Sequence, residues 1–464
     1  MKRSVFLCAF FLVATYFVPT TVNAQVLTIR QAMQAGLDNY ASIKAKQLYV
    51  QASEASVDQA RREYLPNLVI SAQQDYGTVN GQNGPLFGFG GYGVASSGLP
   101  LATQNWNAGF GALYLANVNW EFFTFGRMRE RILVAKQINR RDQADLEQEQ
   151  FQHQVKVAGA YLNFLAAHYI TDSQRKNLER TEVVKNNVVV RALNGLIAGV
   201  DSSLANAEVS NARISLTRAV DNEQEQAARL AFLMGIDPVQ FIPDSTLIRT
   251  VPAASGPTAL SGDHPLLDFY RSRVEVGNEQ LRLTRRGAYP SFSLFGVFQD
   301  RGSGFSSAYT LDQTAYTQNY WDGVKPTRAN YLLGVGVTWN LTSIVRVNAQ
   351  SRSQRFVAEA LQQEYNLTSE QLKSQLALSE QKLSNAFANY REAPLQVSAA
   401  TDAYNQKTAL YRNGLSTMVE VTQAMYALNR AETDRDIVTA NVWQALLLKA
   451  AASGDIAVFT KELN

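Results

Sequence analysis

The sequence predicts a mostly α-helical chain with a small β part, in which long antiparallel helical hairpins accompany four strands. Two stretches, about 126–193 and about 345–411, are expected to be very long helices, and the first is rich in Ala, Gln, Glu, Arg and Leu, which favour helix. Four shorter segments alternate apolar and polar residues, as half-buried strands do. A helix of ~68 residues would be roughly 100 Å long, which no compact globular domain requires. Such lengths indicate a coiled-coil-like assembly of helices.

An internal repeat is the third observation behind this fold class. Asn194-Gly195-Leu196 recurs as Asn413-Gly414-Leu415, and Trp120 recurs as Trp339, both at an offset of 219 residues. Two landmarks 74 residues apart that share one offset are difficult to attribute to chance. We therefore expect two halves built on one plan: a helix, a strand, a loop, a second strand, a long helix and a shorter return helix.

The repeat divides the chain into five expected segments. A signal peptide precedes the first repeat, a proline-containing connector separates the repeats, and a short tail follows the second. The expected bounds are 1–24 for the signal peptide, 25–233 for the first repeat with strands at 67–76 and 113–123, 234–263 for the connector, 264–450 for the second repeat with strands at 291–299 and 330–341, and 451–464 for the tail.

The N-terminus reads as a secretory signal peptide. Lys2 and Arg3 precede a mostly apolar run, and a small-residue cleavage site ends at Ala24. The alternative is a membrane anchor, but the run is short for a membrane span. Cleavage would remove the only cysteine, Cys8, and leave 41 basic against 40 acidic residues, which gives no reason to expect a nucleic acid partner.

The strands have the pattern of membrane strands. Tyr114, Trp120 and Phe122 in the first half, and Tyr331 and Trp339 in the second, fall on the apolar side of the alternation. Aromatic residues near the ends of an apolar strand face are typical of transmembrane β-barrels, and we expect these five to form a membrane-facing aromatic set. A half-buried hairpin on a soluble core is the alternative for any single strand.

Four strands of about ten residues cannot close a barrel alone, and open strand edges are not tolerated in lipid. Copies of the chain must therefore complete it. Two copies would supply eight strands, whose interior is filled by side chains, whereas larger barrels leave an aqueous channel. Three copies would supply twelve strands and enough helices for a hollow helical barrel.

The chain resembles the TolC-like outer-membrane efflux proteins over essentially its whole mature length. The most specific residues are the tip segments Gly195–Asp201 and Gly414–Glu420. The resemblance implies a homotrimer with a twelve-stranded transmembrane β-barrel and a trimeric α-barrel tunnel, located in the bacterial outer membrane and extending into the periplasm. It also implies an exit duct of a tripartite efflux or type I secretion system, docked to a periplasmic adaptor and an inner-membrane pump of the RND or ABC type.

The same resemblance implies the positions of the periplasmic gate. Glu420 matches the first acidic gate residue, Asp201 is its counterpart in the first half, and Gln423 stands where a second acid is often found, which weakens the expectation of cation block. Acids at the start of a helix also stabilise its dipole, so Asp201 and Glu420 have a purely structural alternative.

The two tip turns also have both a structural and a functional interpretation. Gly195 and Gly414 are expected as helix C-cap glycines. The adaptor-docking set is the pair of turns themselves: Asn194, Gly195, Leu196, Asn413, Gly414 and Leu415.

No catalytic, metal or cofactor site is expected. The three histidines are His153, His168 and His264, and their spacing fits neither a metal constellation nor a catalytic triad. An enzyme is therefore disfavoured. A trimeric coiled-coil adhesin anchored in the outer membrane is the remaining alternative, but it would not need the duplicated hairpin plan. The sequence leaves the exported substrate and the pump class open.

Overall fold

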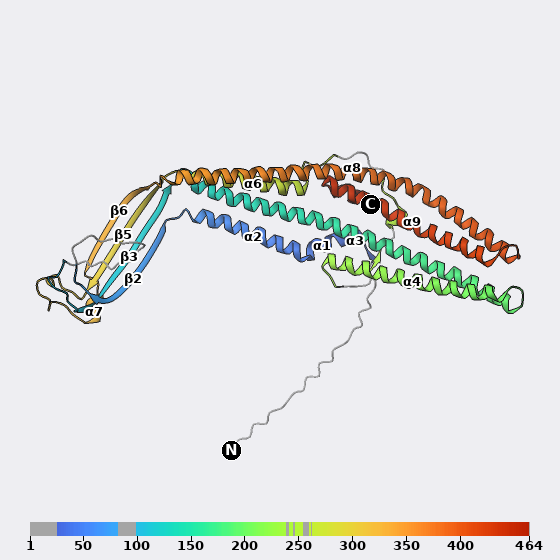
Figure 1. The fold of residues 1–464 in the computed structure, drawn as a ribbon, viewed down its shortest axis with the longest axis horizontal. Coiled ribbons are helices and arrows are strands. Elements are labelled where there is room, and N and C mark those ends of the chain that lie inside the picture. The colour runs from blue at the N-terminus through green and yellow to red at the C-terminus, as the bar shows by residue number, and fades with distance from the viewer. Residues whose placement is uncertain are drawn as a thin grey trace, which may run out of the picture. The chain divides into compact units, whose positions relative to one another are not determined.

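The computed structural model describes residues 26–81, 99–237, 241–244, 246–253, 259–260 and 262–463. The expected signal peptide and part of the first predicted loop lie outside these residues. The described chain is mainly helical with few strands, as the sequence predicts. It divides into two compact units, each assembled from both halves of the sequence (Figure 1). Unit 1 takes the described parts of Met1–Lys44, Glu149–Gly262 and Leu372–Asn464, and unit 2 those of Ala45–Gln148 and Asp263–Gln371.

Unit 2 contains a four-stranded antiparallel sheet. Its strands are β2 (Asn67–Thr78), β3 (Ala108–Phe123), β5 (Ser291–Ser303) and β6 (Arg328–Thr338), in the order β2-β3-β5-β6. The β3–β5 pairing joins the hairpin of the first half to that of the second. β2 and β6 are the edge strands, so each leaves one row of backbone groups without a strand partner among the described residues.

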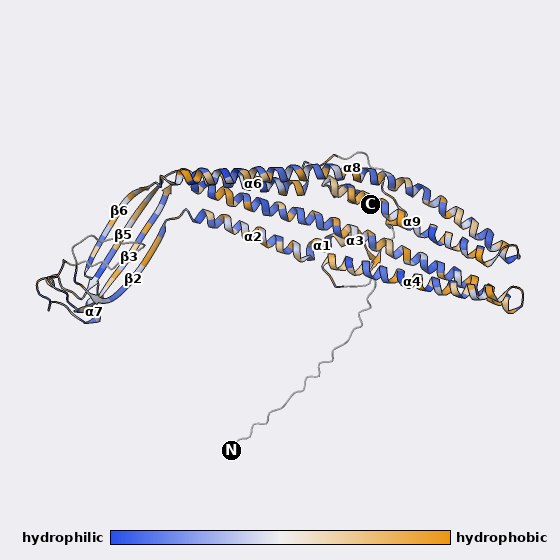
Figure 2. Cartoon of the chain, viewed as in Figure 1, coloured by the Kyte–Doolittle hydropathy of each residue, from blue (hydrophilic) through white to orange (hydrophobic). Residues whose placement is uncertain are grey.

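One face of this sheet is apolar and uncovered over much of its area. The register places Ile70, Ala116, Phe298 and Tyr331 in one row across the four strands. Ile70 is 78% exposed and Tyr331 is 80% exposed. The same face continues through Leu68, Tyr76, Leu294, Leu333, Val335 and Val337, all exposed; we call it the apolar sheet face. The alternation along each strand can be followed in Figure 2.

The helix-to-strand turns are fixed in the same way in both halves. The indole N–H of Trp120 donates to the Tyr64 carbonyl at 2.9 Å, and that of Trp339 donates to the Ala288 carbonyl at 3.1 Å. Each carbonyl lies two residues before the proline that opens a strand. Both tryptophans therefore have a structural role at the strand ends in addition to any membrane contact.

Trp120→Phe and Trp339→Phe should each destabilise the fold by about 1 kcal/mol, because each keeps most of the ring but loses one hydrogen bond. Chemical unfolding of the purified protein measures this. Trp321→Phe is the control, since Trp321 is 75% exposed and lies outside the turns. Equal stability of all three variants would contradict the proposed role of the indoles.

The helices of unit 2 follow the order of the strands. They are α2 (Ala41–Arg62), α6 (Pro265–Arg286) and the first parts of α3 (Arg127–Leu193) and α8 (Ser343–Arg412). Ion pairs join α2 to α3, α3 to α6 and α6 to α8, so each helix pairs with the helix whose strand is adjacent in the sheet. These pairs are Glu63–Arg131 at 2.9 Å, Asp268–Arg140 at 2.8 Å and Arg273–Glu364 at 2.7 Å.

Unit 1 contains the main hydrophobic core. It packs α1 (Ile29–Asn39), α4 (Gly199–Met234) and α9 (Met418–Ser453) with the second parts of α3 and α8. Among the largest fully buried side chains there are Tyr161 and Phe164 on α3, Leu230 on α4, and Trp443 and Leu446 on α9.

The connector and the tail both pack on this core. The connector, expected to be irregular, forms β4 (Ile242–Pro243), which pairs in parallel with β1 (Val26–Leu27), and the short helix α5 (Thr246–Arg249). The tail forms α10 (Ala457–Thr460) and the single turn Lys461–Leu463. Trp443 donates its indole N–H to the Leu247 carbonyl at 2.6 Å, and its ring lies 6.0 Å from that of the fully buried Phe459. One tryptophan thus ties connector and tail to α9.

The helix expected before the first strand is not continuous. The chain leaves the helical conformation at Tyr40, whose φ and ψ are −67° and 125°, so that α1 and α2 are separate helices. The Tyr40 ring stacks on His153 with the ring centroids 3.9 Å apart and meets Phe232 edge-on. Contacts with α3 and α4 therefore fix the break, which no proline or glycine marks in the sequence.

None of the described helices carries an apolar stretch long enough to cross a bilayer. In Figure 2 hydrophilic and hydrophobic residues are interspersed along all the long helices.

Candidate functional site: the two helical tips

Two tight turns end the long helices of unit 1. α3 gives way to α4 after Gly195, and α8 gives way to α9 after Gly414; the φ angles of these glycines are 72° and 75°. In each turn the N–H after the glycine bonds to a carbonyl five residues back, Leu196 to Arg191 at 2.9 Å and Leu415 to Leu410 at 2.9 Å. This is the Schellman geometry of a helix C-cap. A Cβ at either glycine would meet no atom within 4 Å, so the left-handed backbone, not lack of space, requires glycine.

The tips present apolar side chains to solvent. Leu196 is 67% exposed and Leu415 is 75% exposed, and the valines at the start of each return helix, Val200 and Val419, are also exposed. The asparagines before the glycines are exposed as well. Leucines held on rigid turns offer a small apolar surface to a partner.

A small cluster packs the two hairpins together behind the tips. Its buried members come from all four helices: Val184 and Val188 on α3, Ala205 on α4, Tyr411 on α8, and Met418 and Val421 on α9. We call it the tip cluster. Because the hairpins touch through these side chains, a displacement of one tip must repack the other.

Glu420 caps its own helix. Its carboxylate accepts a hydrogen bond from the Ser416 hydroxyl and one from the Thr417 N–H, while Thr417 caps the Glu420 N–H in a capping box. The Lys407 ammonium lies 3.5 Å from the same carboxylate. The Ser416 hydroxyl, the Thr417 N–H and the Lys407 charge hold the pKa of Glu420 below its ordinary value.

This lowered pKa predicts how stability depends on pH. A carboxyl whose folded pKa is depressed stabilises the fold at pH values above its unfolded pKa of about 4.3, and this contribution is lost as pH falls through the folded pKa. Glu420→Gln should therefore lower the melting temperature at pH 7, and the difference from the native chain should vanish as pH falls through the lowered pKa of Glu420. Glu392→Gln, at an exposed acid on α8, is the control. A Glu420→Gln effect that does not change with pH would contradict the assignment.

Asp201 joins the two hairpins. The Tyr411 hydroxyl on α8 donates to its carboxylate at 3.1 Å. Burial and the hydrogen bond to Asp201 raise the pKa of Tyr411 to about 12, so its hydroxyl remains a donor at any physiological pH. The Arg191 guanidinium lies 5.7 Å from the centre of the Tyr411 ring. Asp201 is thus more than a helix N-terminal acid, although it also occupies the first turn of α4.

Gln423 is exposed on α9, one turn beyond Glu420. The structure therefore does not bring Asp201, Glu420 and Gln423 into one cluster within a single chain: Asp201 faces Tyr411, Glu420 faces Lys407 and Gln423 faces outward.

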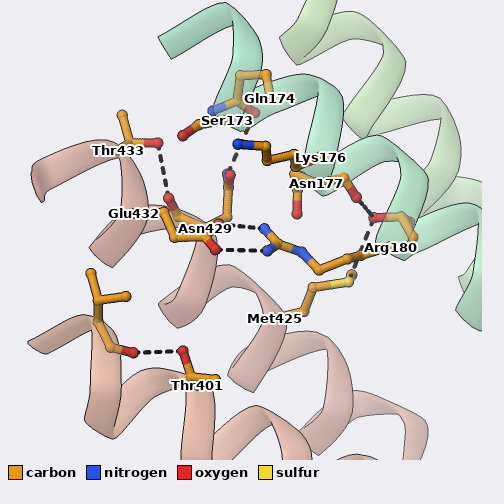
Figure 3. Close-up of polar contacts among 12 residues, drawn as sticks. Ser173, Gln174, Lys176, Asn177, Arg180, Thr401, Met425, Asn429, Glu432 and Thr433 are labelled. Atoms are coloured by element: carbon orange, nitrogen blue, oxygen red, sulfur yellow. Dashed lines mark hydrogen bonds and ion pairs between the residues drawn. The ribbon is translucent and has the colours of Figure 1, made fainter. Parts of the chain in front are cut away.

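A polar layer follows the tip cluster further along α3 and α9. Figure 3 shows Arg180 making two parallel bonds to Glu432, at 2.8 and 2.6 Å. The Ser173 hydroxyl donates to the buried Asp436 at 2.9 Å. Sequence reasoning did not identify Tyr411, Lys407 or this layer, because their partners lie far away in sequence and only helix packing brings them together.

The predicted aromatic set occupies the sheet of unit 2. Tyr331 and Trp339 are exposed, whereas Trp120 and Phe122 are partly covered and in ring contact at 6.2 Å. Tyr114 lies under the short helix α7 (Tyr320–Val324), and its hydroxyl donates to the Val324 carbonyl at 3.2 Å. All five residues are therefore exposed or partly exposed, and the Tyr114 hydroxyl is also engaged by the loop between β5 and β6.

Among the residues that the structure describes, no group of three or more His, Cys, Asp or Glu is arranged to hold a metal ion.

Comparison with known proteins gives a family match over part of the chain and several similar folds. The family model for outer membrane efflux proteins matches residues 32–236. No curated protein sequence matches the chain. Among solved structures, the fold is similar to the outer membrane protein VceC from Vibrio cholerae (16% identity, 92% of this chain and 96% of that chain covered, TM-score 0.72). It is also similar to the CmeC outer membrane channel of Campylobacter jejuni (13% identity, 92% and 85% covered, TM-score 0.72).

A third similar fold is the MtrE outer membrane channel of Neisseria gonorrhoeae, solved in an open state (16% identity, 92% and 89% covered, TM-score 0.70). At these identities the solved structures show similarity of fold alone. Residues 32–236 thus match the outer membrane efflux protein family, and the chain as a whole has the fold of the outer-membrane channels named above.

Proposed function

We propose that three copies of the chain form the exit duct of a tripartite efflux or type I secretion system, a passive conduit across the outer membrane and periplasm. The observation that carries this proposal is the open sheet of unit 2. It has two free edges, β2 and β6, and an exposed apolar face. Unpaired strand edges are not tolerated in lipid, so β2 and β6 must pair with strands of other copies. Three copies supply the twelve strands of a water-filled barrel.

The edge strands have the polarity that such closure needs. β2 runs away from the helices and β6 runs back toward them. β6 of one copy and β2 of the next would therefore pair as antiparallel strands, like every other pair in the sheet. In the same step α8 of one copy would come beside α2 of the next, which continues the ring of helices into a tunnel.

The tips are the proposed contact with other components. Exposed Leu196 and Leu415, each held by a rigid Schellman turn, supply a repeated apolar surface at the end of the helices. We propose that a periplasmic adaptor docks on this surface and connects the duct to an inner-membrane pump. Rigid turns favour docking because little conformational entropy is lost on binding.

The gate is the second element of the proposal. The Tyr411–Asp201 bond and the tip cluster hold the two hairpins of one copy together. Glu420 and Asp201 would line a narrow axis in the trimer, where like carboxylates repel and attract cations. We propose that separation of the hairpins opens the duct.

Single-channel conductance of the purified protein in planar bilayers tests the duct. A water-filled twelve-stranded barrel predicts discrete conductance steps that scale with salt concentration. A protein that inserts but never conducts, under any salt or voltage, would overturn the proposal and favour a plugged anchor for an adhesin.

A further inference from the structure

A shallow pocket lies between α6 and α8 in unit 2, just beyond the strand ends of β5 and β6. Its volume is about 460 Å³, and its lining includes three arginines, one serine and the two residues before Pro290: Arg285, Arg352, Arg355, Ser351, Ala288 and Tyr289. We call it the α6–α8 arginine pocket. All of its lining belongs to the same unit of one chain.

The charge of this pocket is largely uncompensated. Arg285 and Arg352 are exposed, and neither has a carboxylate partner among the described residues. Arg355 has only Glu359, one turn along the same helix, at 3.6 Å. Guanidinium groups brought together without acids repel each other, and their planar N–H donors match the oxygens of a phosphate.

A buried donor lies among these arginines. The Ser351 hydroxyl oxygen is buried and has no hydrogen-bond partner in the described part of the chain. A helical serine usually returns its proton to a carbonyl three or four residues back, and buried hydroxyls are rarely left without a partner. An anion seated between Arg285 and Arg352 would give this hydroxyl an acceptor.

The residues around the pocket are of the types found at a membrane–water interface. Trp339 donates to the carbonyl of Ala288, a pocket residue, so the indole stands at the rim. Trp339 is 52% exposed, Tyr289 is 48% exposed and Val345 is 74% exposed. At the membrane interface, aromatic rings typically lie at the level of the lipid headgroups, and arginine side chains next to them extend toward the headgroup phosphates.

We propose that the α6–α8 arginine pocket binds the phosphate of a phospholipid headgroup in the periplasmic leaflet of the outer membrane. The proposal rests on the insertion of the four strands argued above, which places the strand ends at that leaflet. Arg285 and Arg352 contact the phosphate oxygens, Ser351 donates to one of them, and the acyl chains follow the apolar sheet face beside Trp339. Bound lipid then fixes the depth of the duct in the membrane.

Native mass spectrometry of the full assembly, delipidated in detergent and titrated with phosphatidylglycerol, tests the pocket. The double variant Arg285→Gln/Arg352→Gln should weaken phosphatidylglycerol binding at least tenfold, because two charge-assisted contacts to phosphate are lost. Arg391→Gln, at an exposed arginine on the same helix, should bind like the native chain. Ser351→Ala should weaken binding less than the double variant does.

Three results would overturn the proposal. Unchanged lipid affinity in the double variant would remove the pocket from lipid binding. Full displacement of the lipid by millimolar inorganic phosphate would make it a site for free anions. Dissociation of the variant into monomers would show that the arginines bind a neighbouring copy instead. Because binding is measured in detergent, a native chain that binds lipid but fails to conduct would count against the duct and leave the pocket standing.

Discussion

Replacing Tyr411 with phenylalanine is expected to shift the proposed gate toward its open state by about 100-fold. The substitution keeps the ring in the tip cluster and removes only the hydroxyl that donates to Asp201. One such hydrogen bond contributes about 1 kcal/mol net. If three copies open together, the closed state loses about 3 kcal/mol, and each 1.4 kcal/mol is a tenfold change in the equilibrium.

Open probability in single-channel recordings measures this effect. Tyr404→Phe is the matched control, because Tyr404 also packs against the tip cluster, whereas the hydroxyl that donates to Asp201 belongs to Tyr411. Asp201→Ala should act in the same direction as Tyr411→Phe, and the double variant should add little, since each substitution removes the same hydrogen bond. If the Tyr411 and Tyr404 variants proved indistinguishable, the bond would have no part in gating.

The second large effect is expected at Trp443. Trp443→Ala should destabilise unit 1 by about 3–5 kcal/mol, the usual loss when a buried tryptophan is truncated. Three contacts disappear together: the ring contact with Phe459 and the indole bonds to the carbonyls of Leu247 and Thr250, at 2.6 and 3.1 Å. The connector and the tail would both lose their attachment to α9.

Limited proteolysis and thermal unfolding measure this loss. Cleavage within 246–253 should accelerate in Trp443→Ala, and the melting temperature should fall. Trp443→Phe is the informative comparison, because it restores most of the volume but not the two hydrogen bonds, and it should recover only part of the stability. A melting temperature within one degree of the native chain for Trp443→Ala would contradict the central place of this residue in the core.

The mostly helical fold class was predictable because its signals are local. α3 and α8 have long runs of helix formers with few breakers, and α8 continues through Pro394. The four strands follow from alternation of period two, which needs no knowledge of the partners. β3 nevertheless begins at Ala108, earlier than its alternation indicates, because the glycine-rich segment 108–112 is held by pairing with β2.

Structural features that depend on contacts between residues far apart in the sequence could not be predicted from local patterns. The break at Tyr40 exists because the Tyr40 ring packs against His153 and Phe232, and α5 is attached to α9 because Trp443 donates to the Leu247 carbonyl. Neither contact leaves a periodic trace in the sequence.

In the candidate site, too, the features set by local sequence were predictable and those set by distant contacts were not. The cap glycines Gly195 and Gly414 were predictable, since a positive φ after a long helix leaves a residue signature. The role of Asp201 was only half predictable. Its place at a helix start is local, but its partner Tyr411 lies 210 residues away in sequence.

The mass and membrane insertion of the purified assembly test the central claim most directly. If strands from separate copies complete one barrel, native mass spectrometry of the mature protein should give three chains, and the same particles should enter lipid bilayers and resist extraction by salt. A stable, fully folded single chain that stays in solution without detergent, and that neither associates nor enters lipid, would contradict the account.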